Sequence, residues 1–283
     1  MLGKAELCSC CFVSQVVAWL DTAIVVATGV CIAMYFFSMN LKDSLVVAGA
    51  SSICGSSAAT AISAAVHEGE GMDDSGVPKE DHVCSTIIAL MGLLNTPIMP
   101  LMPMVHEMLN VNPVVVGAWI GGSIDSTGQV IASASLGGDA VLEPATVIKM
   151  TQNVLIGPVV LLLTIYFQKT FRPSILLEKF PLFVVGFFIT SILAVLLRVG
   201  GGLDSEAVDL VRENSWFMSE WVNLIGFARI GLQIDISNFL KNSQNHSILG
   251  LYLLIQSVDL MTTFGWSYLM FHNASYDDDD IDN

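Results

Sequence analysis

The chain has 283 residues, of which 53% are hydrophobic and only 13% are charged. Soluble domains carry about 25% charged residues, so this composition excludes a soluble globular protein and indicates an integral membrane protein, in a plasma or organelle membrane. The formal net charge is -15. That acidic balance argues against nucleic acid as a partner, because phosphate contacts need Lys and Arg.

About 20 helical residues cross the hydrocarbon core of a bilayer, and on that criterion we expect about eight transmembrane helices. They are residues 16–37, 44–66, 84–105, 113–135, 145–168, 181–197, 215–236 and 248–271. The chain is thus predicted to be an all-α polytopic membrane protein with a single membrane domain, residues 1–271, and the lipid bilayer as a partner. Residues 272–283 are predicted to be an acidic disordered tail, because their aspartates cannot bury apolar surface.

Two of these segments are apolar and yet interrupted by small and polar residues. The first reads VVAGASSICGSSAATAISAA over residues 46–65, and the second reads GAWIGGSIDSTGQVIASA over residues 117–134. Glycine and serine weaken a regular helix, and irregular backbone survives in lipid only where protein or a watery cavity covers it. Paired interrupted segments are the best sequence indication of a midplane site in secondary transporters. We therefore expect two broken helices that build one such site.

The broken segments supply candidate ligands for a small anion, because half-helix N-terminal ends present free N–H groups and the positive end of the dipole. The predicted substrate-binding residues are Gly55, Ser56, Ser57, Ser123, Thr127 and Gln129. Close helix packing is an equally good interpretation of any single serine or glycine here. It explains the pair of segments less well, because packing alone does not call for Asp125 beside Gly121 and Gly122.

Ionisable groups inside a span are costly and indicate function. Asp125 is the candidate coupling carboxylate for H⁺ or Na⁺, with Lys149 and Arg229 as its candidate partners. Lys149 could instead extend to the membrane interface, and Arg229 could anchor the end of its span. Asp21 and Asp259 are interpreted as helix-end or interhelical groups.

Proline shapes one further span. Pro97, Pro100 and Pro103 lie in the last third of the segment 84–105. Because proline removes an internal hydrogen bond and kinks a helix, we expect that third to be irregular.

Five motifs, in the same order over nearly the whole chain, carry a family resemblance. They read AGASSICGSSAATA, GAWIGGSIDSTGQVIASA, ATVIKMT, PLFVVGFF and GFARIGLQIDISNFL. In these motifs the chain resembles the UPF0324 (YeiH-type) membrane proteins, which are often labelled as candidate sulfate exporters and are placed in the cation/proton antiporter and anion transporter superfamily. The resemblance implies the inverted-repeat antiporter/bile-acid symporter-like fold, with two crossing, partly unwound helices.

The chain departs from that family pattern at three points. Several N-terminal spans of the family have no counterpart here, which predicts either a fragment of a longer transporter or a partner chain that supplies the missing helices; a homo-oligomer is another candidate assembly. Asp125 stands where the family usually has histidine. Gln152 stands where the family has a basic residue, so a positive charge suited to an anion is missing.

The leading prediction is a secondary transporter that moves a small anion, sulfate-like by the resemblance, by alternating access. The alternatives are a cation/proton antiporter-like carrier that uses Asp125, and a non-transporting membrane subunit. We expect no enzyme, because the sequence lacks HExxH, GxSxG and paired-carboxylate motifs. No cofactor and no metal site are predicted.

Overall fold

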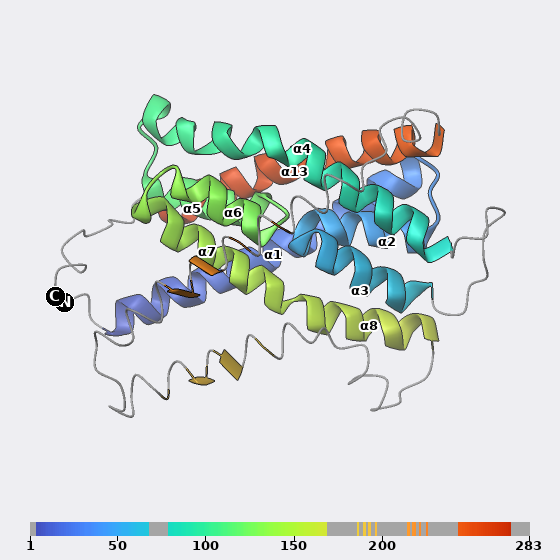
Figure 1. The fold of residues 1–283 in the computed structure, drawn as a ribbon, viewed down its shortest axis with the longest axis horizontal. Coiled ribbons are helices and arrows are strands. Elements are labelled where there is room, and N and C mark those ends of the chain that lie inside the picture. Colours follow the sequence, from blue (N-terminus) through green and yellow to red (C-terminus); the bar gives the residue numbers. More distant parts are fainter. Residues whose placement is uncertain are drawn as a thin grey trace.

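The computed structural model describes residues 4–67, 79–168 and 243–272, together with single positions between 186 and 225. Over these residues the chain is helical and forms no strand, which confirms the all-α prediction. Figure 1 shows an elongated bundle whose long helices run close to its longest axis. The predicted spans 181–197 and 215–236 lie mostly outside the described residues, and Arg229 and the chain beyond residue 272 lie entirely outside them.

The described elements follow one another in a simple order. They are α1 (Lys4–Phe36), α2 (Leu41–Gly49), the π-helix η1 (Ala50–Cys54), α3 (Ser56–Val66), α4 (Lys79–Leu109), α5 (Pro113–Ser123), α6 (Thr127–Ser135), α7 (Asp139–Val154), α8 (Ile156–Gln168) and α13 (Ser243–Phe271). In Figure 1, α13 lies beside α4 and α5, from which it is distant in sequence.

Within the described ranges, 4 helical stretches are long and apolar enough to cross a membrane. They are Ala18–Phe36, Val83–Val105, Asp139–Phe167 and His246–Phe271, and they coincide with the first, third, fifth and eighth predicted spans. The protein is therefore an integral membrane protein. The expected count of eight is not reached within the part of the chain that the structure describes.

The second predicted span is a broken helix. Regular helix α2 ends at Gly49, the chain continues as the π-helix η1, and α3 begins only after Gly55. Gly55 has φ 61° and ψ -121°, a conformation open to glycine and strained for residues with a Cβ atom. π-Helical turns are rare and frequent at functional sites. The interruption expected in this segment is present.

The fourth predicted span is broken as well. Helix α5 ends at Ser123, and α6 begins at Thr127. Between them, Ile124 has φ -83° and ψ 125° and Ser126 has φ -95° and ψ 132°. These angles are extended, so Asp125 lies in a non-helical link between two half-helices.

Helix α4 is more regular than its three prolines predict, since it runs unbroken over Lys79–Leu109. Pro103 has no N–H to give to the carbonyl of Met99, four residues earlier. The Ser133 hydroxyl of α6 donates to that carbonyl at 2.7 Å. A side chain from another helix thus satisfies the group that Pro103 leaves free. The predicted irregularity of this third is wrong, and at Pro103 this bond gives the reason.

Helix α5 packs on α7 with almost no space between the two backbones. A Cβ atom added at Gly121 would collide with the carbonyl oxygen of Ala145, and one at Gly117 with that of Val141. Small residues allow such close approach in membrane helices. The contact holds the α5–α6 break against the helix that carries Lys149.

Candidate functional site

The two breaks meet. A Cβ atom placed on Gly55 would lie 3.6 Å from the Cβ atom and 3.6 Å from the carbonyl oxygen of Asp125. We call this contact the helix crossing. Elements α7 and α13 both pack on η1, and both also pack on α5, so the crossing is enclosed by protein. Irregular backbone at membrane depth requires such cover.

Asp125 is buried at the crossing, with 2% of its surface exposed. Its Oδ2 atom accepts hydrogen bonds from Asn95 Nδ2 of α4 at 2.7 Å and from Tyr252 Oη of α13 at 2.7 Å. The same Tyr252 oxygen lies 3.0 Å from Asn95 Oδ1. Asp125 Oδ1 is buried without a hydrogen-bond partner.

These three side chains form a closed ring of contacts, and each contact needs one hydrogen. The Tyr252 hydroxyl supplies one hydrogen. The Asn95 amide donates through its nitrogen and accepts through its oxygen, so it supplies a hydrogen to only one of its two contacts. Two hydrogens cannot satisfy three contacts, whichever way the amide is turned. All three contacts are hydrogen bonds at once only when Asp125 carries a proton. The geometry therefore suits a carboxyl that binds a proton.

Three buried side chains satisfy the carbonyl groups that the breaks leave free. An interrupted helix has carbonyl groups that find no hydrogen-bond donor within the helix. Each such group left unsatisfied in lipid costs several kcal/mol. The bonds are Lys149 Nζ to the Ile53 carbonyl (2.9 Å), Gln152 Nε2 to the Gly122 carbonyl (3.0 Å) and Gln256 Nε2 to the Ser123 carbonyl (2.8 Å). The C-terminal ends of η1 and α5 are thus closed from within the protein.

Lys149 is an interior residue. Only 1% of its surface is exposed, so it does not extend to the membrane interface. Its ammonium also donates to Gln152 Oε1 at 3.1 Å, and it lies close enough to Asp125 for their charges to interact. Gln152 can accept this bond, whereas an arginine has no acceptor. The departure from the family motif at Gln152 therefore fits the contact that Lys149 makes.

The amide ends of the half-helices are closed less completely. Gly55 and Ser126 precede α3 and α6, and neither gives a side-chain cap. Cys54 lies against the amide N–H groups of Ser57 and Ala58 at the start of α3. Among the described residues, no charged side chain caps the N-terminal end of α3 or of α6.

The predicted substrate ligands lie on both sides of the crossing. Gly55 forms it, Ser56 is exposed, and Ser57 is half-buried in the first turn of α3. The Ser123 hydroxyl donates within α5, to the carbonyl of Trp119 at 2.6 Å. The structure brings the two segments together, and the binding roles of these residues stay predictions.

On the α6 side, the Thr127 hydroxyl accepts from Asn153 Nδ2 at 3.1 Å, and Gln129 is buried. Asn153 Oδ1 is buried without a partner. The first turn of α6 is therefore tied to α7 by a side chain.

Sequence reasoning missed Asn95 and Tyr252 as neighbours of Asp125. Asn95 is a lone amide in an apolar run, and a polar residue at such depth is costly unless it has a partner. That signal could have found Asn95. A tyrosine near the start of the last span gave no comparable signal.

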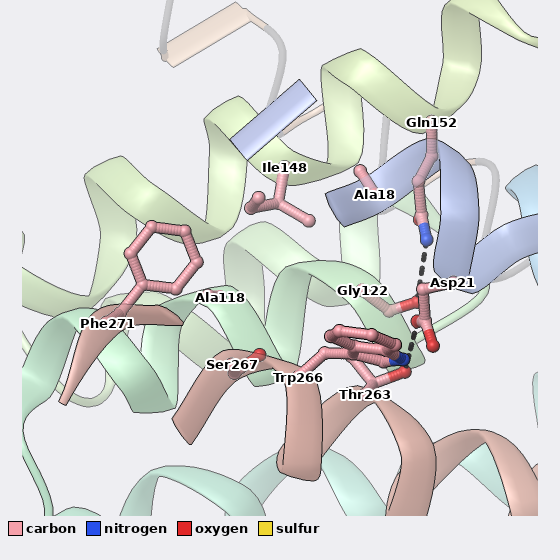
Figure 2. A pocket seen from close by; sticks show the side chains of 10 residues that line it. All are labelled: Ala18, Asp21, Ala118, Gly122, Ile148, Gln152, Thr263, Trp266, Ser267 and Phe271. Carbon is pink, nitrogen blue, oxygen red and sulfur yellow. Dashed lines mark hydrogen bonds between the residues drawn. The ribbon is translucent and has the colours of Figure 1, made fainter. Parts of the chain in front are cut away.

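The interpretation as an interhelical group is confirmed for Asp21, which contacts Thr263 of another helix, whereas Asp259 contacts Thr263 within its own helix. Asp21 of α1 and Asp259 of α13 both contact the Thr263 hydroxyl, at 2.7 Å and 3.1 Å. Figure 2 shows Asp21 and Thr263 directed toward each other beside Gly122 and Gln152. This second polar cluster thus lies next to the end of α5.

Buried carboxyls, a buried lysine and two broken helices define an integral membrane protein with a polar, ionisable interior. Residues 8–250 match the family described as conserved hypothetical protein 698, and the chain belongs to this family, whose curated members are UPF0324 membrane proteins. No solved structure matches the chain.

Three relatives illustrate the match. The UPF0324 membrane protein RB9488 of Rhodopirellula baltica is 31% identical over 266 residues, which cover 90% of this chain and 47% of the relative. A UPF0324 membrane protein of Nitratidesulfovibrio vulgaris is 29% identical over 90% of this chain and 45% of its own length, and one of Lactiplantibacillus plantarum is 27% identical over 76% and 61%. The chain spans about half the length of the first two relatives.

Proposed function

We propose that this protein is a secondary carrier for a small anion, sulfate-like in charge and size, and that the helix crossing of Gly55 and Asp125 is its binding site. What supports the proposal is the difference between the two kinds of helix end. Buried side chains satisfy the carbonyl ends, whereas the residues before α3 and α6 give their amide ends no side-chain cap. Free amides at the positive end of a helix attract anions.

Lys149 adds a positive charge beside the crossing. Its ammonium bonds to the carbonyl of Ile53, two residues before Gly55. A bound anion would therefore meet main-chain amides from α3 and α6 and a buried cation from α7. Ser57 and Thr127 would supply hydroxyl contacts, and Gln129 an amide.

Asp125 would couple anion binding to a proton. Two like charges about 4 Å apart repel each other by about 4 kcal/mol at an effective dielectric constant near 20, so an ionised Asp125 would disfavour the anion. A proton on Asp125 removes that repulsion and completes the ring with Asn95 and Tyr252. The anion and the proton would thus bind together, and either would strengthen the binding of the other.

In the full fold there would be about eight transmembrane helices, and the two broken ones would form the crossing, as in the inverted-repeat carriers that the sequence motifs resemble. Movement of the broken-helix core against the remaining helices would open the site to each side of the membrane in turn. Main-chain amides and helix dipoles at such a crossing can bind an anion even where no arginine contacts it.

A cation/proton antiporter-like carrier is the second candidate. The buried Oδ1 atom of Asp125 has no hydrogen-bond partner, and a carboxylate oxygen is a suitable ligand for Na⁺. In that case Asp125 would bind Na⁺ and H⁺ in turn, and no anion would be carried.

Equilibrium binding of radiolabelled sulfate to the purified full chain in detergent tests the proposal, with Asp125→Asn as the decisive variant. For the unaltered protein we expect tighter binding as the pH falls, by up to about tenfold per pH unit for one linked proton. Asp125→Asn imitates the protonated carboxyl and should bind sulfate tightly at every pH. Asp139→Asn, which removes an exposed carboxyl, is the matched control.

Saturable Na⁺ binding that Asp125→Asn abolishes, in the absence of any sulfate binding, would overturn the anion proposal in favour of the antiporter. Binding of neither ion would favour a non-transporting membrane subunit.

A further inference from the structure

A second acidic pair lies in the interior, next to the ring around Asp125 and not part of it. Asp21 of α1 and Asp259 of α13 are 3% and 2% exposed, and Thr263, which lies between them, is 4% exposed. Thr263 Oγ1 is 2.7 Å from Asp21 Oδ2 and 3.1 Å from Asp259 Oδ1. The two carboxyls therefore share one hydroxyl group.

Hydrogen counting shows that this pair is one proton short. A threonine hydroxyl brings a single hydrogen, and two ionised carboxylates bring none, so only one of the two contacts could be a hydrogen bond. Thr262 also lies near Asp21, but its one hydroxyl hydrogen is directed at the carbonyls of Val258 and Asp259, at 3.0 Å and 3.2 Å. One proton on either carboxyl makes both contacts hydrogen bonds.

The charges around the pair lead to the same count. Asp259 interacts electrostatically with Asp21, Asp125 and Lys149. Within the described part of the chain, these are the ionisable side chains that face it, together with Tyr252 on its own helix. With every carboxyl ionised, three negative charges would face one ammonium. Each uncompensated buried charge is strongly unfavourable. Two bound protons restore the balance: one on Asp125 and one on this pair.

Buried oxygen atoms without hydrogen-bond partners also indicate a proton site at this pair. Asp21 Oδ1, Asp259 Oδ2 and Gln256 Oε1 are buried and have no hydrogen-bond partner among the residues that the structure describes. Of these three residues, Asp21 lines a small cavity together with Thr263 and Gly122, with Trp266 and Phe271 on its apolar side. The cavity has a volume of about 10 Å³, which is close to the minimum that holds one water molecule. Such a cavity is too small for a polyatomic anion.

We propose that Asp21, Thr263 and Asp259 bind one exchangeable proton, at a site separate from Asp125 and next to it. The site joins α1 to α13. Loss of its proton would leave two carboxylates facing one hydroxyl and would weaken the contact between these helices. Thr263 also packs against Gly122 at the end of α5, so the pair is placed to link proton binding to the position of the broken helix. The inference concerns proton binding alone and does not depend on which ion is carried.

Infrared difference spectroscopy of the purified full chain in detergent, in ordinary and heavy water, tests the site. The C=O stretching band of a protonated carboxyl reports each buried acid directly. At neutral pH we expect such a band for the pair, and we expect Asp21→Asn and Asp259→Asn each to remove it, because the one hydroxyl hydrogen then suffices. The double variant Asp21→Asn/Asp259→Asn should lose the same C=O band as either single variant and no further band.

Asp139→Asn is the matched control and should leave every buried-acid band in place. Sulfate binding by the same samples separates the two proposals, since a protein that binds no sulfate can still show the band. A band that neither Asn variant removes would overturn the inference. A band that Na⁺, but not choline, abolishes in a saturable way would show a sodium site instead and would also overturn it.

If the Asn variants fail to fold, two substitutions at Thr263 replace them. Thr263→Val removes the bridging hydroxyl and should shift the band of the pair, and Thr263→Ser keeps the hydroxyl and should leave the band where it is. An unshifted band in Thr263→Val would contradict the shared site.

Discussion

Tyr252 places its hydroxyl oxygen 2.7 Å from Oδ2 of Asp125, so the last described helix closes the gap between α5 and α6. The two residues are 127 positions apart in the sequence. Because the same hydroxyl lies 3.0 Å from Asn95 Oδ1, α4 joins the contact. The break in one helix is therefore held by two others.

The first prediction concerns this hydroxyl. Tyr252→Phe removes a buried donor to Asp125, and we expect it to destabilise the protein by about 1–3 kcal/mol, seen as a lower melting temperature in detergent. Tyr268→Phe, on the same helix with a side chain 51% exposed, should melt like the unaltered protein. Equal melting of both variants would show that the ring around Asp125 contributes nothing to stability.

Gly55 provides a second prediction, because its φ of 61° and ψ of -121° disfavour any side chain. Gly55→Ala should cost about 1–3 kcal/mol from backbone strain, although the Cβ atom itself would meet Asp125 only at ordinary contact distance. Gly265→Ala is the control: this glycine is helical with open space around it, and alanine there should be neutral or stabilising by about 0.5–1 kcal/mol. A Gly55→Ala protein as stable as the control would contradict the observed backbone.

The contact between α5 and α7 gives a third prediction. Gly121→Val forces a side chain into the backbone of Ala145, and we expect a loss of about 1–3 kcal/mol from overpacking. The thermal melting curve measures it, with Gly265→Val as the control of equal size. If Gly121→Val and Gly265→Val have the same melting temperature, the backbones of α5 and α7 are not in contact.

Two serines of α6 form a matched pair for the fourth prediction. Ser133→Ala leaves the part-buried Met99 carbonyl beside Pro103 without its donor, and should destabilise the protein by about 1 kcal/mol, the usual net worth of one such hydrogen bond. Ser135→Ala removes an exposed bond to the carbonyl of Ala132, which water can replace. Comparison of their melting temperatures checks whether α4 depends on Ser133.

The breaks themselves could be predicted from the sequence, because the tendency of glycine and serine to interrupt a helix is local. Asp125 and Lys149 could be selected for a similar reason: a charge in an apolar run stands out whatever surrounds it. The regular course of α4 could not be predicted, since the donor that replaces the missing proline N–H comes from α6.

The partners of the charged groups could not be predicted either. Which face of a nearly uniformly apolar helix turns inward depends on its neighbours, so nothing local indicated that Tyr252 would reach Asp125 or that Thr263 would lie between Asp21 and Asp259. Gln152 and Gln256 were visible as polar residues in or near spans, but their bonds to the carbonyl end of α5 depend on where that helix breaks.

The most direct measurement is the position of a bound anion. Selenate resembles sulfate in shape and charge, and its selenium atom scatters X-rays anomalously, so a structure of the full chain with selenate at low pH can locate it. We predict an anomalous peak at the helix crossing, between the first turns of α3 and α6 and near the Lys149 ammonium, and no such peak in Lys149→Met. A peak elsewhere, or an unoccupied crossing at a saturating selenate concentration, would contradict the proposal that the two broken helices hold the transported ion.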